Sequence, residues 1–132
     1  MPCMAAGTCT STVRVLIADD HRLFAEALEA VLRTEPEVEV VGRAVDGREA
    51  LALAASLEPD VVLLDISMPV MDGFEAAAEI AKLPTKPAVL MLSGSNTPHD
   101  IDQARRAGAS GYVTKDAIAA RLVAAILAAA AP

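Results

Sequence analysis

A chain of 132 residues is long enough to bury one hydrophobic core, so the sequence predicts a single domain. Its net charge of -7 and aromatic content of 2% argue against nucleic-acid binding by this domain, because phosphates are repelled and few rings are present to stack on bases. Cys3 and Cys9 both precede the first predicted strand, which leaves no thiolate metal site or disulfide framework and favours a reducing, cytoplasmic location. No apolar stretch is long enough to span a membrane, and residues 1–12 fit no secretory signal, so we expect them to form a flexible tail.

The first half of the chain alternates strand and helix patterns. The segment "VRVLIADD" (13–20) is β-branched and apolar before its two acids, which predicts a strand, and 38–44 has the same character. Residues 22–33 repeat apolar side chains at helical spacing, and Asp46 is placed to cap a helix over 47–57. The apolar stripe predicted for the first helix is Phe24, Ala27, Leu28, Val31 and Leu32.

The second half continues the alternation. The run "DVVLLD" is wholly apolar between its two acids, as expected for a strand buried on both faces. Asp72 and Asp116 are placed to cap helices, and Pro98 suits the first position of another. The predicted elements are strand 60–65, helix 73–83, strand 88–93, helix 98–108, strand 111–115 and helix 117–131.

Strands that alternate with helices of about three turns predict a parallel sheet with right-handed crossovers and helices on both faces. Five strands are too few to close an eight-stranded barrel, so the predicted fold is an α/β doubly wound sheet of five parallel strands with five helices. The strand order 2-1-3-4-5 is common for such a sheet. Ligands then bind beyond the carboxyl ends of the strands, where the first and third strands meet.

Polar residues stand at the carboxyl ends of four predicted strands. The first strand ends in Asp19 and Asp20, the third in Asp65, the fourth in Ser93 and the fifth in Lys115. Three of these have ordinary alternatives: Asp20 as a helix cap, Ser93 in a turn and Lys115 as a solvated lysine. Asp65 is harder to explain in that way, because desolvating a carboxylate after four apolar residues is costly. All five fall at one edge of the sheet, which favours a functional site.

The predicted site has the chemistry of phosphoryl binding. Three carboxylates close together repel one another, so the cluster calls for a cation, and oxygen ligands suit Mg²⁺ or Mn²⁺. Such an ion and Lys115 neutralise a phosphoryl group, while the Ser93 hydroxyl donates to one of its oxygens. The sequence contains neither a nucleotide-binding P-loop nor a dinucleotide-binding glycine motif. We therefore interpret Asp65 as a carboxylate nucleophile that holds a phosphoryl group covalently.

Four segments resemble, in their order, the receiver domain of two-component response regulators: "LIADDHRLF", "LLDISMPVMDG", "MLSGS" and "GASGYVTKD". The residue patterns of the first and the last segment are similar to those of the NarL/FixJ (LuxR-type) branch of that family. The resemblance covers about residues 13–127, and it implies a flavodoxin-like fold with the receiver domain over 13–131.

The resemblance implies that a sensor histidine kinase is the partner and that its phosphoryl group is transferred to Asp65. It also implies that Mg²⁺ is bound by Asp20, by Asp65 and by the backbone carbonyl of Ser67, with Asp19 contributing through a water molecule. The chain is then a signalling phosphoacceptor in the cytoplasm, and it is not an enzyme with an external substrate.

Further roles follow from the same resemblance. Lys115 and Ser93 are expected to contact the phosphoryl group, and Ser93 and Tyr112 are expected to form the conformational switch. Phosphorylation is expected to control an output, namely transcription through a DNA-binding domain that this chain does not include, and to permit a homodimer. The sequence leaves open whether the receiver acts alone or within a longer regulator.

Three alternative functions fit the sequence less well. A phosphatase of the haloacid dehalogenase type places a second acid two residues after its nucleophile, but Ser67 occupies that position and the chain has no room for a cap insertion. A flavodoxin-like cofactor binder needs a phosphate loop after the first strand, where Asp19, Asp20 and His21 stand. A phosphorylation-independent interaction domain leaves the acidic cluster unexplained.

Overall fold

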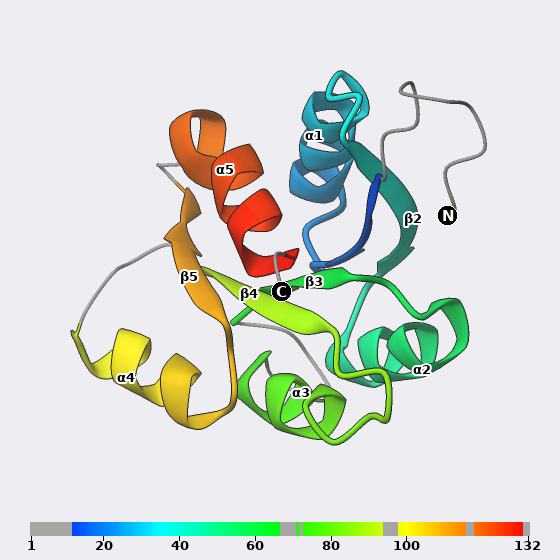
Figure 1. The fold of residues 1–132 in the computed structure, drawn as a ribbon. Helices are drawn as coiled ribbons and strands as arrows, with labels where there is room; N and C mark the ends of the chain where they lie inside the picture. Colours follow the sequence, from blue (N-terminus) through cyan, green and yellow to red (C-terminus); the bar gives the residue numbers. More distant parts are fainter. Residues whose placement is uncertain (1–11, 67–70, 72, 94–97, 116–117, 131–132) are drawn as a thin grey trace.

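The computed structural model describes residues 12–66, 71, 73–93, 98–115 and 118–130 (Figure 1). Five strands form one parallel sheet in the order β2-β1-β3-β4-β5, which confirms the predicted fold class and strand order. The strands are β1 (Val13–Ala18), β2 (Val38–Ala44), β3 (Val61–Asp65), β4 (Ala88–Ser93) and β5 (Gly111–Thr114). The helices are α1 (Arg22–Arg33), α2 (Gly47–Leu57), α3 (Gly73–Ile80), α4 (Pro98–Arg106) and α5 (Ile118–Ala130).

The sheet is covered on both faces, with α1 and α5 on one side and α2, α3 and α4 on the other (Figure 1). Because successive strand side chains point to opposite faces, each buried strand contributes side chains to two hydrophobic cores. On β3, Val61 and Leu63 belong to the core packed against α1 and α5, whereas Val62 and Leu64 belong to the core packed against α2, α3 and α4. The same alternation determines which side chains at the strand ends lie on the same face of the sheet.

The first strand is shorter than predicted. β1 ends at Ala18, because Asp19 turns the chain: its Oδ1 accepts a hydrogen bond from the backbone N–H of His21 at 2.8 Å. The Asp19 N–H still donates to the carbonyl of Ala44 on β2 at 3.0 Å. Asp19 is therefore fixed at the edge of the sheet by its backbone and by its side chain.

Two helices also end earlier than predicted. α3 stops at Ile80 and not at residue 83, because the N–H groups of Lys82 and Leu83 donate to carbonyls three residues back, which tightens the chain into turns. α4 stops at Arg106, and Gly108 follows at a φ of 96°. The N–H groups of Gly108 and Ala109 donate to carbonyls of the last helical turn, which is a Schellman ending.

The predicted cap of α2 is confirmed, since the Asp46 side chain accepts a hydrogen bond from the N–H of Glu49 at 2.7 Å. The predicted apolar stripe of α1 is partly wrong. Its buried residues are Ala25, Leu28 and Leu32, and Val31 is 47% exposed. The predicted caps Asp72 and Asp116 lie outside the described residues.

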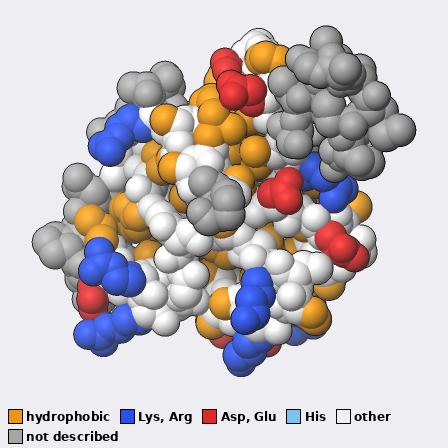
Figure 2. Space-filling model, viewed as in Figure 1, with side chains coloured by type: hydrophobic (Ala, Val, Ile, Leu, Met, Phe, Trp, Pro, Cys, Tyr) orange, Lys and Arg blue, Asp and Glu red, His pale blue; other side chains and the backbone are white. Residues whose placement is uncertain are grey.

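Charged side chains of both signs are dispersed over the face of the molecule shown in Figure 2, where water solvates them. Buried charge is much rarer, and the buried polar residues of the described chain are Asp19, Asp65 and Ser93. In the same part of the chain, no helix has the length and apolar character needed to cross a membrane.

Candidate functional site at the carboxyl edge of the sheet

Three charged side chains reach the same place because the strands carry them to the same face. Asp19, Asp65 and Lys115 each stand two positions after a residue of the core packed against α1 and α5. Side-chain alternation directs Asp65, the last residue of β3, to that face, and ion pairs with Lys115 place Asp19 and Lys115, which directly follow β1 and β5, beside it. The preceding core residues are Ile17, Leu63 and Val113.

The Lys115 ammonium lies between the two buried carboxylates. Its Nζ is 3.5 Å from Oδ2 of Asp19 and 3.5 Å from Oδ1 of Asp65. The Asp19 side chain is fully buried and that of Asp65 is 6% exposed, while Lys115 keeps 25% of its side chain in contact with solvent. The ligand atom that Asp20 offers lies within 4.8 Å of those of Asp19 and Asp65, so this group combines three carboxylates with one ammonium.

One buried oxygen of the group lacks a hydrogen bond. Asp19 Oδ1 accepts from the His21 N–H, but Asp19 Oδ2 accepts no hydrogen bond from the described residues. A buried carboxylate oxygen without a donor costs free energy unless a cation or water compensates it, and the Lys115 ammonium at 3.5 Å compensates this one in part. The excess of negative charge in the group fits a site for a divalent cation.

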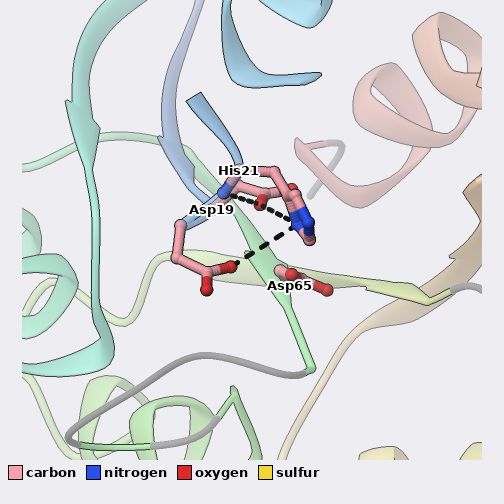
Figure 3. A group of neighbouring side chains, drawn as sticks. Asp19, His21 and Asp65 are labelled. Atoms are coloured by element: carbon pink, nitrogen blue, oxygen red, sulfur yellow. Dashed lines mark hydrogen bonds and ion pairs between the residues drawn. The ribbon is translucent and has the colours of Figure 1, made fainter. Parts of the chain in front are cut away.

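Four possible ligands are close enough to share an ion. Asp19, Asp20, His21 and Asp65 each offer one ligand atom, and these atoms lie within 4.8 Å of one another. Figure 3 shows Asp19, His21 and Asp65 gathered beyond the ends of β1 and β3. The capping alternative for Asp20 is not supported, because the N-cap residue of α1 is His21, whose side chain makes no capping hydrogen bond. The predicted ligand Ser67 lies outside the described residues.

Sequence reasoning missed a contact that positions Lys115. Its Nζ lies 4.5 Å from the centre of the Phe24 ring, a cation–π contact between the segment after β5 and helix α1. Phe24 was recognised as part of an apolar stripe only, since nothing in its local pattern reveals a partner 91 positions away. An aromatic residue in the first turn after the paired acids was the available signal.

Gly73 also escaped sequence reasoning. A Cβ at this position would stand 2.3 Å from the carbonyl oxygen of Asp65 and 2.7 Å from Cα of Ile66. Its N–H donates to the carbonyl of Ile66 at 2.8 Å. The first turn of α3 therefore rests directly on the backbone that carries Asp65, and a side chain would push the two apart.

Ser93 and Tyr112 lie toward the other face of the sheet. Ser93 is 7% exposed and follows Met91 of the core packed against α2, α3 and α4 by two positions. Tyr112 is half-buried, pairs with Met91 in the register of β4 and β5, and packs against the same core. A cavity of about 140 Å³ adjoins its ring, lined by Ile101, Ala104, Arg105, Ala109, Ser110, Gly111 and Tyr112.

Comparison with known proteins gives consistent matches. The family model for the response regulator receiver domain matches residues 15–127. The transcriptional regulatory protein LiaR of Bacillus subtilis is 38% identical over 89% of this chain and 56% of its own length. The probable transcriptional regulatory protein NarL of Mycobacterium tuberculosis is 43% identical over 87% of this chain and 53% of its own. The chain thus spans about half the length of the curated relatives it matches.

Solved structures agree with these relatives. The signal receiver domain of NarL from Mycobacterium tuberculosis superposes with a TM-score of 0.85 at 41% identity, covering 91% of this chain and 97% of that one. The response regulator domain of Thermotoga maritima CheB superposes with a TM-score of 0.84 at 32% identity, covering 90% and 96%. The resemblance inferred from four short segments is thereby confirmed over most of the chain.

Proposed function

The chain belongs to the response regulator receiver family, in its NarL/LuxR branch, and on this premise we propose that Asp65 accepts a phosphoryl group from a sensor histidine kinase. The supporting observation is the buried pair Asp19 and Asp65, both 3.5 Å from the single ammonium of Lys115. In the transfer, a carboxylate oxygen of Asp65 bonds to phosphorus as the bond from phosphorus to the kinase histidine nitrogen breaks, and that nitrogen keeps the electron pair.

The acidic group supports a magnesium requirement. Asp20 and Asp65 would hold Mg²⁺ or Mn²⁺ together with the carbonyl of Ser67, and Asp19 would contribute through water. When bound, the ion supplies the positive charge that three carboxylates and an incoming phosphoryl group require. The buried Asp19 oxygen without a hydrogen bond fits this proposal.

The remaining residues receive roles from their positions. Lys115 bonds a phosphoryl oxygen from its place beside Asp65, and the Ser93 hydroxyl donates to another. Ser93 and Tyr112 lie on the α4 side of the sheet, so movement of Ser93 toward the phosphoryl group is coupled to Tyr112 and to the adjoining cavity. The proposed readout is a changed α4–β5 surface, which acts on a partner or a second copy and, through it, on transcription.

Incubation with acetyl phosphate, followed by intact mass measurement, tests this function without a kinase. We expect a gain of one phosphoryl group that requires Mg²⁺. Equal gain after removal of Mg²⁺ by a chelator would contradict the proposed metal dependence.

Asp20→Ala tests the ligand role directly. We expect its Mg²⁺ affinity, followed by titration, to fall by about 10-fold or more, because removal of even an outer-shell partner costs about 10–100-fold in metal affinity. Asp102→Ala is the matched control, since this exposed aspartate on α4 pairs only with Arg106 among the described residues. Identical titrations for the two variants would remove Asp20 from the ligand set.

A further inference from the structure

The His21 imidazole lies beside the acidic group, and the contacts of the described residues give it no structural role. It is the N-cap residue of α1, yet its side chain makes no capping hydrogen bond. The side chain is 75% exposed, and its Nδ1 lies 3.8 Å from Asp19 Oδ1 and 3.7 Å from Asp20 Oδ1 (Figure 3). The imidazole therefore faces the same carboxylates that are proposed to hold a metal ion.

A second observation, independent of the imidazole, fits a ligand site at this place. The fully buried Asp19 side chain is directed into the group, and its Oδ2 accepts no hydrogen bond from the described residues, its partner being the Lys115 ammonium at 3.5 Å. The other oxygen is fixed by the His21 backbone N–H at 2.8 Å. This hydrogen bond fixes the backbone of His21 against Asp19, and the imidazole nitrogen of His21 faces the Asp20 carboxylate.

The distances suit a shared ion after a small adjustment. With metal–ligand bonds of about 2.1 Å, neighbouring ligand atoms in tetrahedral or octahedral sites are separated by about 3.0–3.5 Å. The distance of 3.7 Å from His21 Nδ1 to Asp20 Oδ1 exceeds this range by a few tenths of an ångström, and the ligand atom that Asp65 offers lies within 4.8 Å of the others. Because the imidazole is mostly exposed, it can move by this amount without disturbing the core.

A nitrogen ligand changes which ions the site prefers. Mg²⁺ takes oxygen ligands, whereas imidazole suits Ni²⁺, Zn²⁺ and other transition-metal ions. We propose that His21 is a ligand for borderline transition-metal ions, which it binds through Nδ1 together with Asp20 and Asp65. This inference rests on the carboxylate group of the proposed function. It implies that such an ion competes with Mg²⁺ for Asp65.

Nickel and magnesium titrations by calorimetry test the proposal. All proteins carry Cys3→Ser and Cys9→Ser, because thiolates bind nickel themselves. We expect His21→Ala to lower Ni²⁺ affinity by about 10-fold or more, since even outer-shell changes cost that much, and to leave Mg²⁺ affinity unchanged. His99→Ala is the control, because the sequence holds two histidines and this one belongs to α4.

Three results would overturn the proposal. Equal Ni²⁺ affinity in His21→Ala and its parent would exclude the imidazole as a ligand. Equal losses of Ni²⁺ and Mg²⁺ affinity would show that His21 only organises the carboxylates. Unchanged Ni²⁺ binding in Asp65→Asn would place the ion away from the shared site. The titrations contain no phosphodonor, so their outcome is independent of whether Asp65 accepts a phosphoryl group.

Discussion

β3 carries an aspartate at each end, and the two aspartates have opposite surroundings. Asp60, before the strand, is exposed, and its Oδ2 accepts a hydrogen bond from the Arg14 N–H at 2.9 Å. Asp65, at the other end, is 4% exposed and lies 3.5 Å from the Lys115 ammonium. The same residue type thus has two different roles at the two ends of β3, directly before the strand and at its last position.

The difference extends to the two edges of the sheet. At the amino edge, charge remains in water and its partners are backbone groups, as in the hydrogen bond from Arg14 Nη1 to the Glu58 carbonyl at 3.0 Å. At the carboxyl edge, Asp19 and Asp65 are buried with one ammonium between them. Buried charge without full compensation lowers stability, so its retention points to function.

The largest stability effect is expected where the backbone of the carboxyl edge is displaced. Gly73→Ala should lower the free energy of unfolding by about 1–3 kcal/mol, because the new Cβ overpacks against the Asp65 carbonyl. It should also slow acetyl phosphate labelling by about 10-fold or more, since small displacements of reacting groups are costly. Urea denaturation and intact mass measure the two effects.

Gly111→Ala is the counterpart at the start of β5. Its Cβ would meet the end of the Leu90 side chain at 2.6 Å, and such a flexible group can move aside. We expect a smaller stability loss and unchanged labelling. Equal labelling defects in both glycine variants would show that the contact of α3 with Asp65 has no special role.

Loss of the ammonium should have the next largest effect. Lys115→Met leaves Asp19 and Asp65 facing each other without a cation, and we expect a destabilisation of about 1–2 kcal/mol, below that of a fully buried pair because Lys115 is partly exposed. Added Mg²⁺ should restore part of the loss. Thermal unfolding with and without Mg²⁺ measures both.

Arg14→Met provides the comparison at the amino edge. It removes one side-chain hydrogen bond to a carbonyl, and we expect a loss of about 0.5–1 kcal/mol that does not respond to Mg²⁺. A Mg²⁺ response of the same size in both variants would contradict the assignment of the ion to the carboxyl edge.

The smallest effect on phosphoryl labelling is expected for an acid that shares the carboxyl edge and lies outside the site. Asp46→Ala removes the cap of α2 and should cost about 1 kcal/mol of stability. Its acetyl phosphate labelling should equal that of the parent at a temperature where both are folded. Loss of labelling in Asp46→Ala would show that an acid anywhere at this edge is required for phosphoryl transfer, and that the buried group has no special role.

Much of the fold could be predicted because its signals are local. The apolar run of β3, the Asp46 cap and Pro98 at the start of α4 each depend on a few neighbouring residues, and each is found in the structure. The early end of α3 is also local, since the hydrogen bonds of Lys82 and Leu83 to carbonyls three residues back end the helix before Pro84.

The site was predictable only in part. The order of the strands and their common direction bring Asp19, Asp65 and Lys115 to one edge of the sheet. The contact of Lys115 with Phe24 and the support that Gly73 gives to Asp65 depend on how distant segments pack. Such contacts leave no periodic trace in the sequence, which explains why they were missed.

The most direct test compares the two aspartates of β3. Asp65→Asn, Asp60→Asn and the parent are incubated with acetyl phosphate and Mg²⁺, and intact masses are measured after circular dichroism confirms folding. Our account predicts one added phosphoryl group in the parent and in Asp60→Asn, and none in Asp65→Asn. An added phosphoryl group in Asp65→Asn, or its loss in Asp60→Asn alone, would contradict the assignment of the phosphoacceptor to the carboxyl end of the strand.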